Sequence, residues 1–204
     1  NLIASNSVST DYACDIGALP FFSQWRSIII GPSEEVVWSF DDLKGAFYLF
    51  KLPASWAPLF AFDAAFRASD LGLGPECGKT VYLGATIMPM VYKNAMGLVQ
   101  YIHRRMLAAS EQGPVGYPGG LPRSRELRKD RICPARVPNS ALASSWQVDC
   151  DDADYAELVQ SMVALGDPAL ASRARRLYAK LQAPRSHKNG THTHECVRLG
   201  AKVD

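Results

Sequence analysis

Two short apolar runs, far apart in the sequence, each lead directly into aspartates. They are EVVWSF (35–40) before Asp41-Asp42, and WQV (146–148) before Asp149, Asp151 and Asp152. Runs rich in β-branched and aromatic residues are typical of strands. Carboxylates this close repel one another, so each must stay hydrated, be paired or bind a cation. Either the two strands are neighbours and their carboxylates converge on a site for Mg²⁺, which prefers oxygen ligands, or the aspartates form two separate solvated turns.

Hydrophobic periodicity predicts an α+β fold. The clearest helix is KNAMGLVQYIHRRMLAASE (93–111), whose apolar residues recur at helical spacing. Further helices are predicted at 155–165 and 169–181, strands at 35–40, 144–150 and 196–203, and a hairpin turn at Asn189-Gly190. This order of elements favours an α+β sheet that is covered by helices on one face.

Basic residues cluster although the formal net charge is only +2. Residues 104–105, 123–131 and 173–180 are basic, whereas 149–157 is acidic. A basic rim around an acidic centre suits a polyanionic substrate and a metal; charges that only solvate the surface are the alternative. Residues 112–139 contain five prolines and four glycines, so we expect a basic insertion or flexible loop there, and a second loop at 64–80.

The five cysteines are widely spaced and include no CxxC pair, which favours reduced thiols in an intracellular protein. No apolar run reaches membrane-spanning length, and no signal peptide is recognised. We therefore expect a protein of the cytoplasm or nucleus that is neither secreted nor bound to a membrane. Because the sequence starts at Asn1 rather than Met, we expect a fragment of a longer protein.

An ordered set of motifs resembles that of reverse transcriptases from retrotransposon-like elements. The stretch FDDLKGAFYLFKLP followed by LFAF resembles the first catalytic motif, and MPMVYKNAMGLVQYIHRRM resembles the second, a turn that opens a long helix. WQVDCDDADYAEL resembles the third, a hairpin with an aspartate pair. APRSHKN and VRLGAKVD resemble the closing motifs, a lysine-bearing loop and a strand. The motifs keep the family's order over residues 36–204.

The resemblance implies a role for each residue that matches a catalytic position. Asp42 of the first motif and the pair Asp151 and Asp152 of the third would bind two Mg²⁺ ions, with Mn²⁺ as an alternative. Lys188 would protonate the leaving pyrophosphate; a solvated loop charge is the alternative.

Four further positions match substrate contacts of the family. Leu43 would offer its backbone carbonyl, and Phe47 would form an aromatic gate that excludes a ribose 2′-hydroxyl; an ordinary core aromatic is the alternative for Phe47. Met90 and Val91 occupy substrate-binding positions of the second motif, where glutamine and glycine are common.

For the whole chain, the resemblance implies a polymerase palm, a ferredoxin-like antiparallel sheet backed by helices, with a partial fingers subdomain. The expected segments are 1–33 (fingers-like), 34–63 (first part of the palm), 64–87 (a fingers-like loop region) and 88–204 (second part of the palm, with the insertion 112–139). The implied activity is RNA-directed DNA polymerisation. A DNA primer on an RNA template attacks the α-phosphate of a deoxynucleoside triphosphate through its 3′-hydroxyl and releases pyrophosphate.

Two positions depart from the family pattern. Asp149 stands where the third motif usually has an aromatic residue, and Val91 stands where glycine lets backbone and substrate approach closely. These departures favour an alternative: a catalytically inactive, degenerate retroelement remnant that keeps a nucleic-acid-binding, polymerase-like fold. The retained Asp42, Asp151 and Asp152 favour the enzyme.

Overall fold

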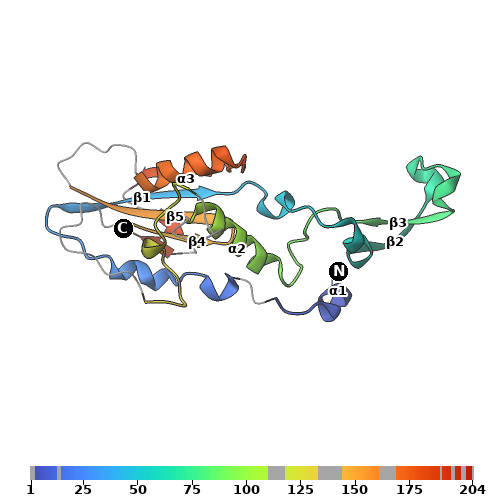
Figure 1. The fold of residues 1–204 in the computed structure, drawn as a ribbon, viewed down its shortest axis with the longest axis horizontal. Coiled ribbons are helices and arrows are strands. Elements are labelled where there is room, and N and C mark those ends of the chain that lie inside the picture. Colours follow the sequence, from blue (N-terminus) through green and yellow to red (C-terminus); the bar gives the residue numbers. More distant parts are fainter. Residues whose placement is uncertain are drawn as a thin grey trace. The chain divides into compact units, whose positions relative to one another are not determined.

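The computed structural model describes residues 3–12, 15–109, 118–132, 144–160, 169–188, 190–193, 196–198 and 201–203. The chain forms two compact units. Unit 1 contains residues 1–12 and 46–95, and unit 2 contains residues 13–45 and 96–204. Many of the helices and strands of both units are labelled in Figure 1.

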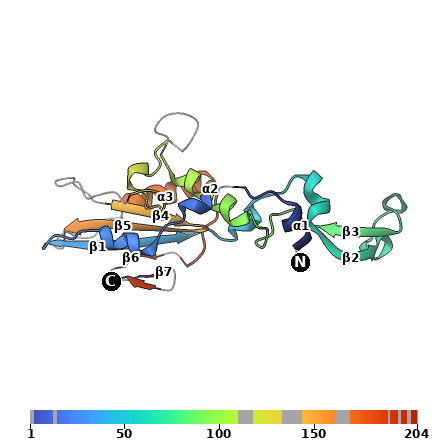
Figure 2. The same cartoon turned by 90° about the horizontal axis from the view of Figure 1, so that it is seen from below.

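Unit 2 is built on a four-stranded antiparallel sheet with the strand order β4-β5-β1-β6. The strands are β1 (Glu34–Asp42), β4 (Ser144–Asp149), β5 (Asp152–Gln160) and β6 (Gly190–Thr193). Two helices, α2 (Ala95–Leu107) and α3 (Ala169–Lys180), lie on one side of this sheet (Figure 2). Short 3-10 helices η1 (Asp15–Ala18), η2 (Phe22–Ser27) and η7 (Arg123–Arg125) and the hairpin of β7 (Cys196–Arg198) and β8 (Ala201–Val203) complete the described part of this unit.

The helix-covered face of the sheet is held by polar as well as apolar contacts. The side chain of Glu157 in β5 accepts hydrogen bonds from the first two backbone N–H groups of α3, at Ala169 (2.8 Å) and Leu170 (2.9 Å). These N–H groups have no partner within the helix, and a carboxylate there also complements the helix dipole. The buried hydroxyls of Tyr155 and Tyr178 lie 3.4 Å apart across the same interface. The sequence of β5 therefore fixes where α3 begins.

The opposite face of the sheet carries a separate apolar cluster. Trp38 and Ala156, which are paired across β1 and β5, pack there with Trp25 and Leu127. The rings of Trp25 and Trp38 meet edge to face, with centroids 4.9 Å apart. On the same face, a Cβ atom added to Gly190 would lie 2.2 Å from Cε1 of Phe40, its partner in β1. Only glycine therefore fits this position of β6.

Unit 1 contains the hairpin of β2 (Ala61–Arg67) and β3 (Thr80–Gly84). Its other elements are α1 (Ile3–Val8) and the 3-10 helices η3 (Ala46–Leu49), η4 (Ala54–Phe60), η5 (Ala68–Leu71) and η6 (Pro75–Cys77). The rings of Phe60 and Tyr92 meet edge to face with centroids 5.3 Å apart, and both residues are buried. Asn94 joins the two ends of this unit, because its side chain accepts from the N–H of Tyr12 and donates to the carbonyl of Thr10.

The predicted α+β class is confirmed: antiparallel sheets and helices make up the described residues. The helix predicted at 93–111 is observed as α2, that at 169–181 as α3, and the strands at 35–40 and 144–150 as β1 and β4. The strand predicted at 196–203 is two shorter strands, β7 and β8. No helix among the described residues is both long and apolar enough to span a membrane.

Three predictions of local structure are wrong. Residues 155–160 are not helical but form most of β5, whose pairing with β1 and β4 on both sides overrides the helix-like spacing of Tyr155 and Leu158; residues 161–165 lie outside the described part. The expected loop 64–80 is wrong only at its ends, because residues 64–67 belong to β2 and Thr80 to β3; residues 68–79 contain just the short 3-10 helices η5 and η6. Gly190 lies in β6 rather than in a turn, and Asn189 is outside the described residues.

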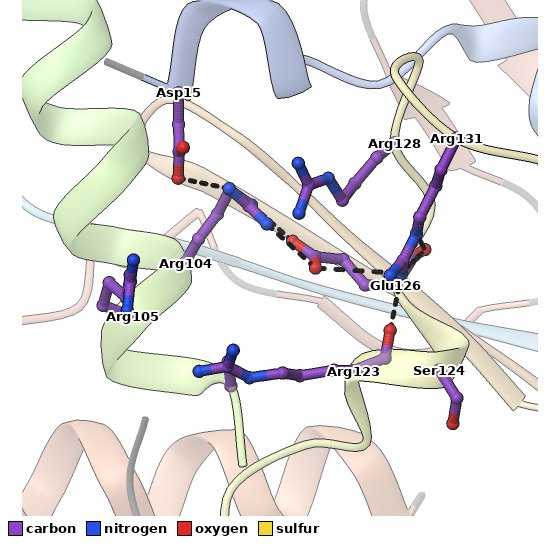
Figure 3. Close-up of a pocket in the computed structure, with 9 residues that line it drawn as sticks. Asp15, Arg104, Arg105, Arg123, Ser124, Glu126, Arg128 and Arg131 are labelled. Atoms are coloured by element: carbon purple, nitrogen blue, oxygen red, sulfur yellow. Dashed lines mark hydrogen bonds and ion pairs between the residues drawn. The ribbon is translucent and has the colours of Figure 1, made fainter. Parts of the chain in front are cut away.

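The expected insertion or flexible loop 112–139 is described over residues 118–132, which contain one short 3-10 helix, η7, but pack against the rest of unit 2. Leu121 and Leu127 of this segment are buried. The N–H of Leu121 donates to the carbonyl of Leu107 in α2 (2.7 Å), and the N–H of Leu127 donates to the carbonyl of Trp146 in β4 (2.7 Å). The segment thus covers the free edge of β4. A pocket of about 550 Å³ lies between it and α2 (Figure 3).

We predict that Leu127→Ala lowers the free energy of unfolding by about 2–5 kcal/mol, because it leaves a cavity in the cluster around Trp38. Ile132→Ala, in the same segment, is the matched control: Ile132 is 94% exposed, whereas Leu127 is 1% exposed. We expect the control to change the free energy by no more than about 0.5 kcal/mol. Urea denaturation followed by tryptophan fluorescence measures both, and equally small effects would contradict the packing of this segment.

Candidate functional site

The register of the sheet places three aspartates in one row. Asp42 at the end of β1 is the partner of Asp152 at the start of β5, and Asp152 is also the partner of Asp149 at the end of β4. Directly opposed residues of antiparallel strands share a face, with Cβ atoms about 4.5–5.5 Å apart. All three side chains are half-buried. We call Asp42, Asp149 and Asp152 the aspartate row.

Asp151 lies beside the row, in the two-residue turn between β4 and β5. Its carbonyl accepts a hydrogen bond of 2.9 Å from the N–H of Leu43, so the chain just after β1 is joined to this turn. Leu43 is itself buried. The structure thus brings the predicted residues Asp42, Leu43, Asp151 and Asp152 together at one end of the sheet.

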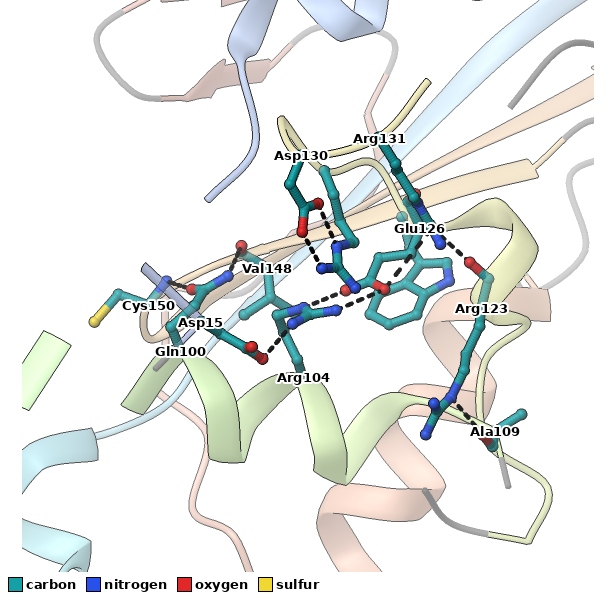
Figure 4. A network of polar contacts seen from close by, with 12 residues as sticks. Asp15, Gln100, Arg104, Ala109, Arg123, Glu126, Asp130, Arg131, Val148 and Cys150 are labelled. Atoms are coloured by element: carbon teal, nitrogen blue, oxygen red, sulfur yellow. Dashed lines mark hydrogen bonds and ion pairs between the residues drawn. The ribbon is translucent and has the colours of Figure 1, made fainter. Parts of the chain in front are cut away.

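The turn is held by two side chains of α2, Gln100, which is drawn in Figure 4, and His103. Cys150 has a left-handed backbone (φ 58°), which is uncommon for a residue other than glycine. The side-chain carbonyl of Gln100 accepts from the N–H of Cys150 (2.6 Å), and its amide donates to the carbonyl of Val148 (2.8 Å). Nδ1 of His103 lies 2.8 Å from the carbonyl of Cys150. Together these bonds occupy both polar backbone groups of Cys150.

The environment of His103 determines its protonation. A carbonyl only accepts hydrogen bonds, so Nδ1 carries the proton towards Cys150, and Nε2 accepts the hydroxyl proton of Tyr178 at 2.7 Å. Burial lowers the pKa of His103 to about 4, against the opposing effects of the Cys150 carbonyl and the charges of Asp152 and Asp41. His103 is therefore neutral at physiological pH, and both of its ring nitrogens are engaged in positioning the turn.

Asp41 differs from its neighbour Asp42, because it points to the helix-covered face and is buried. Nη1 of Arg185 lies 2.7 Å from its Oδ1, and Nε of Arg175 in α3 lies 3.2 Å from the same atom. Two cations compensate this carboxylate, as a buried charge requires. Asp41 therefore anchors the end of β1 to α3 and to the segment that follows it.

The lysine predicted to act on the leaving group follows this anchor. The N–H of Lys44 donates to the carbonyl of Pro184 (2.9 Å), and the N–H of Ser186 donates to the carbonyl of Asp42 (2.7 Å). Residues 184–186 therefore pair with the end of β1. Lys188 comes two residues later; it is exposed, and its N–H donates to the hydroxyl of Ser186. Its main chain is thus tethered beside Asp42.

The remaining predicted residues belong to unit 1, whereas the aspartates, Leu43 and Lys188 belong to unit 2. Phe47 is buried in η3. Met90 is 60% and Val91 69% exposed, and the carbonyl of Val91 accepts from the side chain of Asn6. Within unit 1, Phe47 thus has the burial of a core aromatic, and the side chains of Met90 and Val91 face solvent.

Carboxylates at the aspartate row provide the donors that Mg²⁺ prefers. Among the described residues, no three His, Cys, Asp or Glu side chains are arranged to hold a metal ion by themselves. Mg²⁺ in nucleotidyl-transfer sites is commonly bound by one or two carboxylates, with phosphates and water filling the other positions. The donor chemistry of Asp42 with Asp151 or Asp152 therefore fits Mg²⁺ bound together with a substrate.

Sequence reasoning did not find the residues that position the turn. Gln100 and His103 are three residues apart on α2, a spacing that puts them on one helix face among apolar residues. Nothing in their own segment indicates that this face meets the aspartate hairpin.

No protein-family model matches the chain, and no curated protein matches it either.

We predict that the pKa of His103 makes the protein less stable in acid. Because the folded state lowers this pKa from 6.5 to about 4, the unfolded chain binds the proton first as the pH falls. Above pH 6.5, His103 is neutral in both states and does not lower the free energy of unfolding. Between pH 6.5 and pH 4, the free energy of unfolding decreases by about 3 kcal/mol. Urea denaturation at the two ends of this range should show this loss for the parent and a loss smaller by about that amount for His103→Gln. His187→Gln, at an exposed histidine, is the control; if His103→Gln kept the parent's pH dependence, the neutral buried histidine would be refuted.

Proposed function

We propose that this chain is the palm, with part of the fingers, of an RNA-directed DNA polymerase of a retroelement. The observation that carries the proposal is the register that sets Asp42 opposite Asp152, with Asp151 in the adjoining turn. A polymerase palm needs carboxylates from two neighbouring antiparallel strands at one end of a sheet. The sheet of unit 2, with α2 and α3 on one face, is compatible with that architecture.

The proposed substrates are an RNA template, a DNA primer and a deoxynucleoside triphosphate. Asp42, Asp151 and Asp152 would hold two Mg²⁺ ions, or Mn²⁺ in their place. When bound, such ions neutralise the charge that develops on the transferred phosphate and polarise the attacking hydroxyl. The protein's own contribution is positioning: Gln100 and His103 hold the turn at Cys150.

Other residues have proposed roles in substrate binding and proton transfer. The carbonyl of Leu43 would add an oxygen ligand, and Nζ of Lys188 would donate a proton to the leaving pyrophosphate. Phe47 would act as the gate under the incoming sugar, and Met90 and Val91 would contact the nucleotide. The exposure of Lys188, Met90 and Val91 leaves these side chains accessible to a ligand.

One observation favours a second candidate, an inactive remnant that only binds nucleic acid. Asp149 is directly opposed to Asp152, so it adds a third carboxylate to the row. Like charges directly opposed on a sheet are destabilising, and the 3′ end of a primer is itself part of a polyanion. An aromatic ring at this position would give the primer an apolar surface to pack against; Asp149 does not.

Primer extension on a poly(rA)/oligo(dT) template with Mg²⁺ or Mn²⁺ tests the enzyme. We expect the parent chain to incorporate dTTP, and Asp42→Asn and Asp151→Asn to reduce the rate by about 100-fold or more, the loss typical of removing one electrostatic contact in an active site. Asp70→Asn, at an exposed aspartate of unit 1, should keep the parent's rate. Extension that survives Asp42→Asn would reject the site. A folded parent without extension would favour the remnant. In that case, primer extension recovered by Asp149→Tyr would identify the Asp149 carboxylate as the cause of the lost activity.

We also predict that Mg²⁺ stabilises the protein against unfolding through these carboxylates. At ten times its Kd, the ion should add about 1.4 kcal/mol, because it relieves the repulsion between directly opposed aspartates. Thermal unfolding in the presence of dTTP and Mg²⁺, compared with dTTP and NaCl at matched ionic strength, measures the shift in Tm. The shift should disappear in Asp42→Asn and remain in Asp70→Asn. An equal shift in both variants would place the bound ion elsewhere.

A further inference from the structure

Five arginines line the pocket of about 550 Å³ between α2 and residues 123–131 in unit 2 (Figure 3). They are Arg104, Arg105, Arg123, Arg128 and Arg131. Glu126 in the pocket wall is paired with Trp146, so the pocket lies at the edge of β4 rather than on the aspartate row. None of its residues belongs to the site proposed for polymerisation.

Positive charge exceeds negative charge in this pocket. The carboxylates that line it are Asp15 and Glu126, and both pair with Arg104, which forms a two-pronged contact with Glu126. Arg131 lies 3.8 Å from the same glutamate. Arg128 pairs with Asp130 just outside the pocket, with Nε 2.7 Å from Oδ1. Five arginines therefore share three carboxylates.

Neighbouring arginines repel the charge of Arg131 within this cluster. Burial lowers the pKa of Arg131, and repulsion from Arg128 and Arg104 lowers it further, against the raising effect of Glu126. An anion bound among these guanidinium groups would relieve that repulsion. Arginine's planar fork of N–H donors suits the oxygens of a phosphate group in particular.

Aromatic rings accompany the arginines. The guanidinium of Arg105 lies over the ring of Tyr101, 4.6 Å from its centroid, and Lys129 lies 5.9 Å from the ring centroid of Phe21. Both rings are exposed, Tyr101 by 38% and Phe21 by 56%. A free phosphate ion has no planar group that could stack on an aromatic ring. A single-stranded nucleic acid uses both features, because its phosphates bind cations while its bases stack on aromatic side chains.

We propose that this pocket binds the phosphate backbone of single-stranded nucleic acid, with Tyr101 and Phe21 as stacking surfaces for unpaired bases. Arg105 and Arg123 are the principal phosphate contacts, since both line the pocket while Arg104 and Arg131 are needed to neutralise Glu126. Nε of Arg123 also donates to the carbonyl of Ala109 (2.9 Å). The proposal adds a nucleic-acid contact outside the aspartate row. Because binding at the pocket requires neither a metal ion nor that row, it can hold or fail independently of the proposed polymerase activity.

Fluorescence anisotropy of a labelled short oligouridylate, in EDTA to remove metals, tests the proposal. We expect the double variant Arg105→Gln/Arg123→Gln to weaken binding by about 10-fold or more, and to reduce the slope of log K against log salt by about 1.4, for two phosphate contacts. The matched control is Arg176→Gln/Lys180→Gln, which removes two charges from exposed positions of α3. Equal losses in both double variants, or no binding by the parent, would overturn the proposal.

A second comparison separates a nucleic-acid strand from free phosphate groups. Tyr101→Ala and Phe21→Ala should each weaken oligouridylate binding by about 5- to 100-fold, while tripolyphosphate binding, measured by calorimetry, should not change. If both ring variants bound oligouridylate like the parent while tripolyphosphate bound in the pocket, the site would be one for free phosphates and the proposal would be wrong.

Thermal unfolding of every variant verifies the fold, and Arg104 and Arg131 are kept because they neutralise Glu126.

Discussion

The pairing of β1 with β5 is the constraint on which the rest of unit 2 depends. The same register that sets Trp38 opposite Ala156 in the apolar cluster sets Asp42 opposite Asp152 at the end of the sheet. A slip of one residue would exchange the two faces. Trp38 would then turn towards α3 and Asp41 away from its arginines. Packing in the middle of these strands therefore holds the carboxylates at their end in place.

Adjacent aspartates at the end of β1 have opposite environments because successive side chains of a strand alternate between faces. Asp41 meets Arg175 and Arg185, which compensate its charge on the helix-covered side. Asp42 instead joins the aspartate row. Removing either arginine would leave a buried charge only partly compensated and would loosen the end of the strand that carries Asp42. The structural aspartate thus supports the position of the candidate catalytic one.

Sequence patterns predicted the elements whose burial is periodic and missed those whose burial depends on distant partners. Because α2 and α3 have one apolar face and β1 and β4 have strand-like runs, the local spacing of apolar residues was enough to predict them. β5 is buried along most of its length, and Tyr155 and Leu158 imitate helical spacing. Leu121 and Leu127 lie in a Pro- and Gly-rich segment that becomes core only against α2 and β4. The aspartates were found because they are a cluster in sequence; Gln100 and His103 were not, because their partner is the Cys150 turn.

Opposite charges lie close together along β4. Glu126, in the arginine pocket, is paired with Trp146, and Asp149 lies three residues further along the same strand, about 10 Å away. The negative field of the row is strong enough to act on the thiol between its members: burial, followed by the charges of Asp151 and Asp149, raises the pKa of Cys150 to about 12. A polyanion held by the arginines would meet repulsion on approaching the row unless a cation were bound there. If the proposed polymerase function holds, attraction at the pocket and repulsion at the row would together make productive binding of a nucleic acid conditional on the metal, and the protein's own charges would impose that condition.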